Sequence, residues 1–317
     1  GAPAGLRRRQ GAGCGGRRCL RWPLRVGCGL LARFGAPREE LVPVARRRHR
    51  HLDEPHVVLC AVGSDCDDLV GQGVLPHLLD HAAQNDLIII ATHAWGHGCD
   101  FITENPSLLD QARRDLTAWL ESHKDHPGLG AILVGNEIPS DMARWMTPWK
   151  VNRALDGLIR TCQKVAAGIP IGYANFPTTE YLEPPSADFT AFNIYLEDGE
   201  ALESYLPRLH HLAGDRPVYL TEFGLDTNRN PEDVQAALLP TALKSTRAAG
   251  FAGATLYAWS DHWLNNGQTM DDWSFGLVRR DGSEKPALTA LRKLVLPTPL
   301  PSNPPRFSVI ICTRNGA

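Results

Sequence analysis

Two glutamates each stand at the end of a short apolar run, where α/β proteins often place catalytic side chains. Glu137 follows the run 131–136 (AILVGN), and Glu222 closes the run 217–222 (PVYLTE). Active sites of parallel α/β barrels lie at the carboxyl ends of the strands. A facing carboxylate pair can cleave a glycosidic bond, because one protonates the leaving oxygen while the other attacks the anomeric carbon or activates water. Either glutamate alone would more often cap a helix or form a salt bridge, but the pair favours catalysis.

Other polar side chains follow neighbouring apolar runs and are candidates to line the same pocket. His93, Trp95 and His97 come after the run 87–92, and Asn175 comes after 169–174. His93 and His97 could begin a metal site with Asp100, but no further ligand is placed in the sequence to complete it. We therefore expect neither a metal ion nor a cofactor.

The elements that position these residues alternate from residue 74 onward between apolar runs and amphipathic stretches. Such alternation predicts parallel strands joined by crossover helices. Strands are expected at 87–92, 131–136, 169–174, 189–194, 217–222 and 253–259, and helices at 108–123, 148–167, 200–212, 231–249 and 285–296. Only the run 56–62 (HVVLCAV) offers a further strand upstream. The predicted fold is an α/β (β/α)8 barrel whose first two strands are incomplete or irregular. Without them the sheet would keep an open edge.

The contexts GNE at Glu137 and TEFG at Glu222 resemble those of the large clan of retaining (β/α)8 glycoside hydrolases. The resemblance implies that Glu137 is the acid/base on strand four and that Glu222 is the nucleophile on strand seven. It also implies that Asn136 contacts the sugar 2-hydroxyl. In a retaining enzyme the two carboxyl groups lie about 5 to 5.5 Å apart.

Further positions match the same clan. Tyr195 in FNIY corresponds to a tyrosine that contacts the nucleophile, although a strand-end tyrosine can also anchor a loop. Trp259 in YAWSDHW corresponds to an aromatic floor for the sugar, although it could equally pack in the core. The segment 271–287 resembles the one after strand eight in family 2 β-glycosidases, where we expect it to act as a scaffold.

Over residues 74–317 the chain also resembles bacterial proteins in which a glycosidase-like barrel precedes a family 2 glycosyltransferase domain. The Pro-rich stretch 297–305 reads as a linker. Residues 306–317 (RFSVIICTRNGA) resemble the opening strand of such a transferase, where Thr313 and Arg314 would lie near the nucleotide. The expected domains are thus 1–52, the barrel at 53–296, the linker, and the start of the transferase.

The first 52 residues differ in composition from the rest of the chain. They hold 13 arginines, no lysine and only two glutamates, although the whole chain has a net charge of -2. Such an arm can bind nucleic acid, but its only aromatic residues are Trp22 and Phe34. We favour a disordered or irregular segment, an incorrect boundary or an out-of-frame start, and expect no nucleic-acid partner.

Cysteine spacing and hydropathy bear on the compartment. The eight cysteines show neither zinc-site spacing nor a disulfide framework. No apolar run is long enough to span a membrane, and the N-terminus lacks the apolar segment of a secretory signal. These features favour a cytoplasmic location.

Three functions remain open on the sequence. The favoured one is a retaining glycosidase or transglycosylase that acts on an oligo- or polysaccharide such as a β-glucan. The second is a carbohydrate-binding barrel without activity that positions a glycan for an attached transferase. The third is a fragment of a protein whose main activity is glycosyl transfer.

Overall fold

A computed structural model describes residues 31–33, 58–63, 74–85, 87–93, 99–262, 264–265, 268–269 and 271–294. The linker at 297–305 and the transferase-like segment at 306–317 lie outside these residues, as does nearly all of the N-terminal segment. One three-residue strand is described within that segment. No helix in the described part of the chain is long and apolar enough to cross a membrane.

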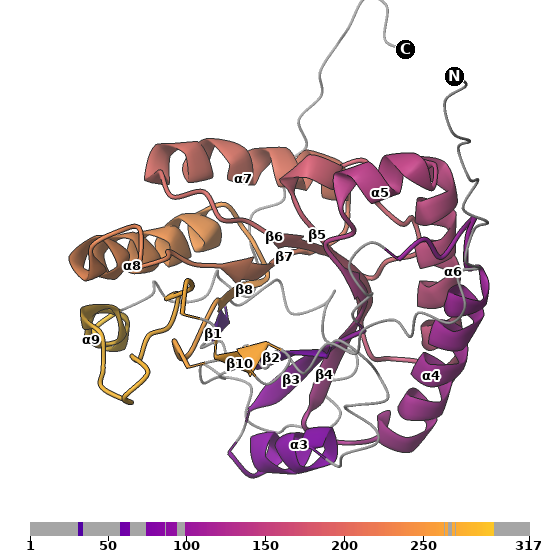
Figure 1. The fold of residues 1–317 in the computed structure, drawn as a ribbon, viewed down its shortest axis with the longest axis horizontal. Helices are drawn as coiled ribbons and strands as arrows, with labels where there is room; N and C mark the ends of the chain where they lie inside the picture. Colours follow the sequence, from indigo (N-terminus) through magenta and orange to yellow (C-terminus); the bar gives the residue numbers. More distant parts are fainter. Residues whose placement is uncertain are drawn as a thin grey trace, which may run out of the picture.

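One curved sheet forms the centre of the fold (Figure 1). Its strands are β1 (Leu31–Arg33), β2 (Val58–Gly63), β3 (Ile88–His93), β4 (Leu129–Asn136), β5 (Ile171–Asn175), β6 (Thr190–Asn193), β7 (Val218–Phe223) and β8 (Gly253–Leu256). A separate hairpin pairs β9 (Leu264–Asn265) with β10 (Gln268–Thr269). The seven strands expected from the sequence are all present, with bounds that differ by a few residues.

Helices follow most strands and cover the outer face of the sheet (Figure 1). They are α3 (Val74–Gln84), α4 (Ser107–His123), α5 (Ser140–Trp145), α6 (Pro148–Val165), α7 (Gly199–Ala213), α8 (Glu232–Ala248) and α9 (Pro286–Arg292), with a 3-10 turn η1 (Pro177–Thr179) between β5 and β6. The five helices expected from periodicity are therefore confirmed. Helices α3 and α5 and strand β1 were not predicted from the sequence.

Strand order departs from an ideal (β/α)8 barrel at the start of the chain. Neighbouring strands from β2 to β8 pair in parallel, but β1 pairs antiparallel with β8, with Leu31 opposite Thr255. No pairing joins β1 to β2 among the described residues, although the two strands lie close together. The fold is therefore a mixed α/β barrel in partial form, and eight parallel strands are not observed.

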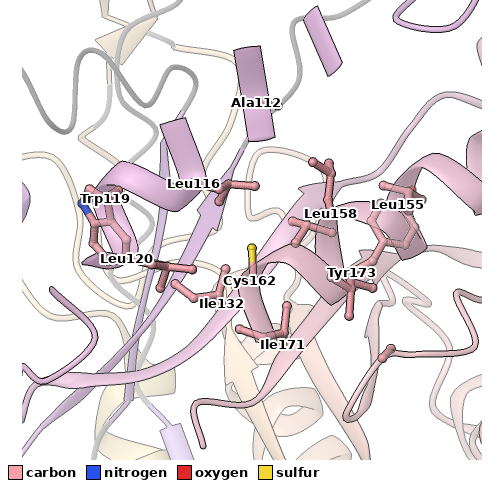
Figure 2. Close-up of a cluster of buried hydrophobic side chains, with 14 of the residues drawn as sticks. Ala112, Leu116, Trp119, Leu120, Ile132, Leu155, Leu158, Cys162, Ile171 and Tyr173 are labelled. Carbon is pink, nitrogen blue, oxygen red and sulfur yellow. The ribbon is translucent and has the colours of Figure 1, made fainter. Parts of the chain in front are cut away.

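Side chains point alternately to the two faces of the sheet, so the strands contribute to an inner core and to an outer core. On β4, Ala131 and Leu133 belong to the inner cluster, whereas Ile132 and Val134 face the helices. Figure 2 shows this outer core, in which side chains of α4 and α6 pack on β4 and β5. Helix α6, one of the amphipathic stretches predicted from the sequence, buries the face that runs from Leu155 to Cys162.

Pairing becomes irregular at the carboxyl ends of the strands that carry the candidate site. Register shifts occur between Leu133 and Asn136 on β4, between Phe192 and Asn193 on β6, and between Leu220 and Phe223 on β7. Irregularities of this kind redirect side chains, and they are frequent next to active sites. Asn136, Asn193 and Glu222 all lie at or within these shifts.

Candidate active site

Glu137 is the first residue after β4, and its backbone is held in an uncommon conformation. Its φ is 46°, in the left-handed region that non-glycine residues rarely adopt. Its N–H donates to the carbonyl of Ala174 at 2.9 Å, and the next N–H, of Ile138, donates to the Tyr173 hydroxyl at 3.0 Å. Burial, and then the charge of Glu137, raise the pKa of Tyr173. The phenol therefore stays neutral beside the carboxylate.

Asn193, on β6, joins the two glutamate-bearing strands. Its side-chain Nδ2 donates to Asn136 Oδ1 and to Glu137 Oε1, both at 3.0 Å, and its Oδ1 accepts from the Thr221 hydroxyl at 2.6 Å. Only 1% of Asn193 is exposed. A buried amide with this many partners fixes the rotamer of every group it contacts.

Glu222, on β7, contacts the tyrosine that the sequence reading placed beside it. The Tyr195 hydroxyl donates to Glu222 Oε2 at 2.5 Å. Burial, followed by the charge of Glu222, raises the pKa of Tyr195 well above its ordinary value. The phenol therefore keeps its proton at neutral pH and can donate a hydrogen bond to the carboxylate.

Besides burial, the charges of both carboxylates raise the pKa of the Tyr195 hydroxyl. Glu137 contributes to the raised pKa of Tyr195, as does Glu222. Asn193 adds a second link, since it contacts Glu137 directly and Thr221, the neighbour of Glu222. The carboxylates of β4 and β7 therefore converge on the same end of the sheet, next to Asn193 and Tyr195.

Two aromatic side chains pack around Tyr195, and neither is Trp259, the residue expected to form a floor for the sugar. Tyr257 and Phe275 meet its ring edge to face, with centroids 6.0 and 5.6 Å away. Strand β8 ends at Leu256, so Trp259 lies beyond the strand and is 38% exposed. Tyr257, which the sequence reading missed, is the side chain of YAWSDHW that packs against Tyr195.

Gly224 allows the ends of β7 and β8 to approach each other closely. A Cβ atom at this position would lie 2.0 Å from the carbonyl oxygen of Tyr257, where no side chain fits. The glycine of TEFG is thus a packing requirement next to Glu222.

The remaining predicted pocket residues are placed as follows. Burial lowers the pKa of His93, at the end of β3, to about 4, so its imidazole is neutral at pH 7. Trp95 and His97 lie outside the described residues. Asn175 is expected to line the pocket, but its amide donates to the Leu182 carbonyl and accepts from the Thr179 hydroxyl. Alternation explains the difference, because Asn175 follows Ala174, which points inward.

The carboxylate of Asp100 forms hydrogen bonds within its own loop and with a tryptophan. Its carboxylate accepts from the N–H groups of Ile102 and Thr103 and from Trp145 Nε1, the last at 3.0 Å. Burial opposes ionisation here, but the hydrogen bonds from Thr103 and Ile102 together lower the pKa of Asp100 to about 2. No group of three or more potential metal ligands occurs among the described residues.

A buried ion pair joins the segment 271–287 to the loop that follows β8. Lys285 Nζ lies 2.8 Å from Asp261 Oδ2 and also donates to the Thr227 hydroxyl and the Ser274 carbonyl. Lys285 and Asp261 are both buried. This lysine therefore links the loops that follow β7 and β8 to the start of α9.

Neither a family model nor a curated protein matches this sequence. Solved structures do match. A β-glucuronidase from Ruminococcus gnavus, in complex with C6-substituted uronic isofagomine, has a TM-score of 0.56 at 19% identity over 68% of this chain and 41% of its own. A β-glucuronidase from an uncultured Clostridium sp. has a TM-score of 0.54 at 18% identity, covering 69% of this chain and 42% of its own.

The chain thus spans about two fifths of the length of these enzymes. At such identities the likeness shows a shared fold. The described part of this chain accordingly shares the α/β-barrel fold of these two structures, in partial form.

Proposed function

We propose that the protein is a retaining glycoside hydrolase in which Glu222 is the nucleophile and Glu137 the acid/base. The observation that carries this proposal is the convergence of the two carboxylates on Tyr195, with different hydrogen-bond donors for each. Two carboxyl groups in unlike surroundings are what double displacement requires, because one must begin ionised and the other protonated.

Glu222 has the surroundings of a nucleophile. Its Oε2 accepts a hydrogen bond from the Tyr195 hydroxyl, which is itself held neutral. Such a hydrogen bond favours the ionised carboxylate. In the first step a Glu222 oxygen attacks the anomeric carbon and the glycosidic C–O bond breaks. The leaving oxygen takes the proton of Glu137.

Glu137 then acts as a base in the second step. It removes a proton from water, or from a sugar hydroxyl in transglycosylation, as that oxygen displaces Glu222 from the anomeric carbon. An amide N–H such as that of Asn193 can donate to either protonation state of Glu137, so the same contact serves both steps. We expect the two carboxyl groups to lie about 5 to 5.5 Å apart.

Asn136 is proposed to bind the substrate. Its Oδ1 accepts from Asn193, which orients the side chain and leaves the amide N–H2 group to donate. The 2-hydroxyl of the sugar whose anomeric carbon is attacked can accept a hydrogen bond from this group. The proposed substrate is a β-glycoside, and the transferase-like residues 306–317 favour a glucan-like polymer.

Time-resolved mass spectrometry with 2-fluoro β-glucosyl fluoride and its glucuronyl counterpart tests the proposal. Wild type should form a covalent adduct that maps to Glu222, and Glu222→Gln should form none. Glu137→Gln should still be labelled, because fluoride leaves without an acid, but its adduct should turn over slowly. Glu121→Gln, an exposed change on α4, is the matched control. A folded wild-type chain that neither reagent labels would refute the proposed function.

A further inference from the structure

Large apolar side chains are exposed at only one end of the barrel in the described part of the chain. They are Trp145, Trp149, Tyr181, Val234 and Trp259. Each lies in a segment that follows the carboxyl end of a strand: β4 for the first two, and β5, β7 and β8 for the others. This is the end that carries Glu137 and Glu222. Exposed apolar side chains that lie together mark binding surfaces.

Three of these aromatic residues lie on the Glu137 side of the site. Trp145 closes α5 and is 67% exposed, Trp149 is in the first turn of α6 and is 61% exposed, and Tyr181 follows η1 and is 45% exposed. Helix α5 contacts both α6 and η1, which brings the segments together. In Figure 1, α5 lies beside α6.

The three residues, here called the aromatic track, are connected to Glu137. Trp145 comes eight residues after Glu137, and the chain between them consists of a short connection and α5. The Cα atoms of Glu137 and Trp145 are therefore at most about 18 Å apart. Tyr181 lies on the β5 side of the site, because the carbonyl of the next residue, Leu182, accepts from Asn175 at the end of β5, and Tyr173 is on the same strand. The Tyr173 hydroxyl contacts Ile138, the residue next to Glu137.

The best exposed ring of the track is held in a fixed orientation. Trp145 Nε1 donates to Asp100, of which only 4% is exposed and whose carboxylate is anchored by Ile102 and Thr103. An indole with its single polar atom bonded to a buried anion loses little further freedom on binding. Its face is therefore presented to solvent as a preorganised platform.

We propose that the aromatic track binds the leaving-group side of a polysaccharide, so that the enzyme acts on chains and poorly on short glycosides. The inference rests on the proposed function, because Glu137 protonates the leaving oxygen and the track lies on its side. The apolar C–H face of a pyranose ring packs on an aromatic face, and successive sugars repeat that contact. A glycan is favoured over a protein because the track lies at the same end of the barrel as the proposed catalytic centre, on segments that follow β4 and β5.

The test compares a short and a long substrate in matched variants. Trp145→Ala/Trp149→Ala should retain the kcat/KM of wild type on an aryl β-glycoside but lose about 10-fold or more on hydroxyethyl cellulose, laminarin or glucuronoxylan, whichever wild type prefers. Arg144→Ala, an exposed change on the same helix, should behave as wild type on both. Trp145→Phe keeps a ring without the bond to Asp100 and should fall between them.

Binding without turnover and covalent labelling keep the two proposals separate. Affinity electrophoresis in gels containing these polysaccharides should retard wild type and Arg144→Ala but not the double variant. If the fluorosugar labels wild type but none of the three polysaccharides retards it, the proposal of a glycan-binding track is overturned and the proposed function stands. Retardation without labelling would support the track and refute catalysis. A change from dimer to monomer in the double variant, with retardation unaffected, would identify a self-association surface and overturn the inference.

Discussion

The hydroxyl of Tyr195 offers the most direct test of how the site is tuned. Tyr195→Phe removes the donor that lies 2.5 Å from Glu222 Oε2 and leaves the ring, with its edge-to-face contacts to Tyr257 and Phe275, in place. A hydrogen bond to a charged group contributes about 1.5 to 3 kcal/mol. At 1.36 kcal/mol per pH unit, its loss should move the acidic limb of the kcat/KM profile by about one to two units.

The direction of this shift follows from the state that the bond favours. The phenol of Tyr195 is held neutral and stabilises the ionised carboxylate of Glu222, so without it a higher pH is needed to ionise Glu222, the proposed nucleophile. The acidic limb should therefore move to higher pH. The assay is kcat/KM on an aryl β-glycoside across the acidic range, with the fluorosugar adduct at Glu222 followed in parallel.

Tyr205→Phe is the matched control. The Tyr205 hydroxyl also donates to a glutamate, Glu180, at 2.5 Å, but this pair joins α7 to the β5–β6 connection. Removing it should leave the acidic limb where it is. A Tyr195→Phe profile that superimposes on wild type, or an equal shift in Tyr205→Phe, would show that the hydroxyl does not tune Glu222.

Three further predictions concern single residues. Asn193→Ala should lower kcat/KM by roughly 10- to 100-fold, because it removes the donor to Glu137, whereas Asn152→Ala, which loses only a bond to the Glu183 carbonyl, should not. Lys285→Met should lower the free energy of unfolding in urea by about 3 to 5 kcal/mol, because Asp261 is left buried without its cation, and adding Asp261→Asn should restore part of it; a loss below about 1 kcal/mol would contradict this. The pKa of His93 is lowered from 6.5 to about 4, so the unfolded chain binds more protons between these values and stability should decline as the pH falls through that window. His93→Gln should show a weaker decline in urea titrations at closely spaced pH values, and an unchanged slope would exclude His93 as its source.

Sequence periodicity predicted most of the sheet because buried parallel strands form continuous apolar runs. The runs that became β3 to β8 end within a few residues of the predicted limits, and helix α6 buries its predicted face. Strand β1 has only three residues, too few for a pattern, and it pairs antiparallel to β8. Helix α5 has six residues and follows Pro139, so no helical repeat develops.

Within the site, the sequence indicated which residue types end each strand but not where each side chain points. Glu137, Glu222 and Tyr195 were predicted from their contexts, and the contact between Tyr195 and Glu222 is observed. Asn193 was missed, although it is the last residue of β6 and precedes Tyr195 by only two residues. Asn175 faces its own loop, because the same alternation that turns Ala174 inward turns its neighbour outward.

The order of the site residues along the chain has a consequence for recombination. Asn193 and Tyr195, the partners described for the two carboxylates, lie between Glu137 and Glu222 in sequence. Asn193 is on β6, which is next to β7, and only β5 separates β6 from β4. A crossover outside that interval would transfer both glutamates together with these partners as one inherited block. Libraries that exchange flanking segments around this block can therefore vary the surroundings of the candidate site while the two glutamates keep Asn193 and Tyr195.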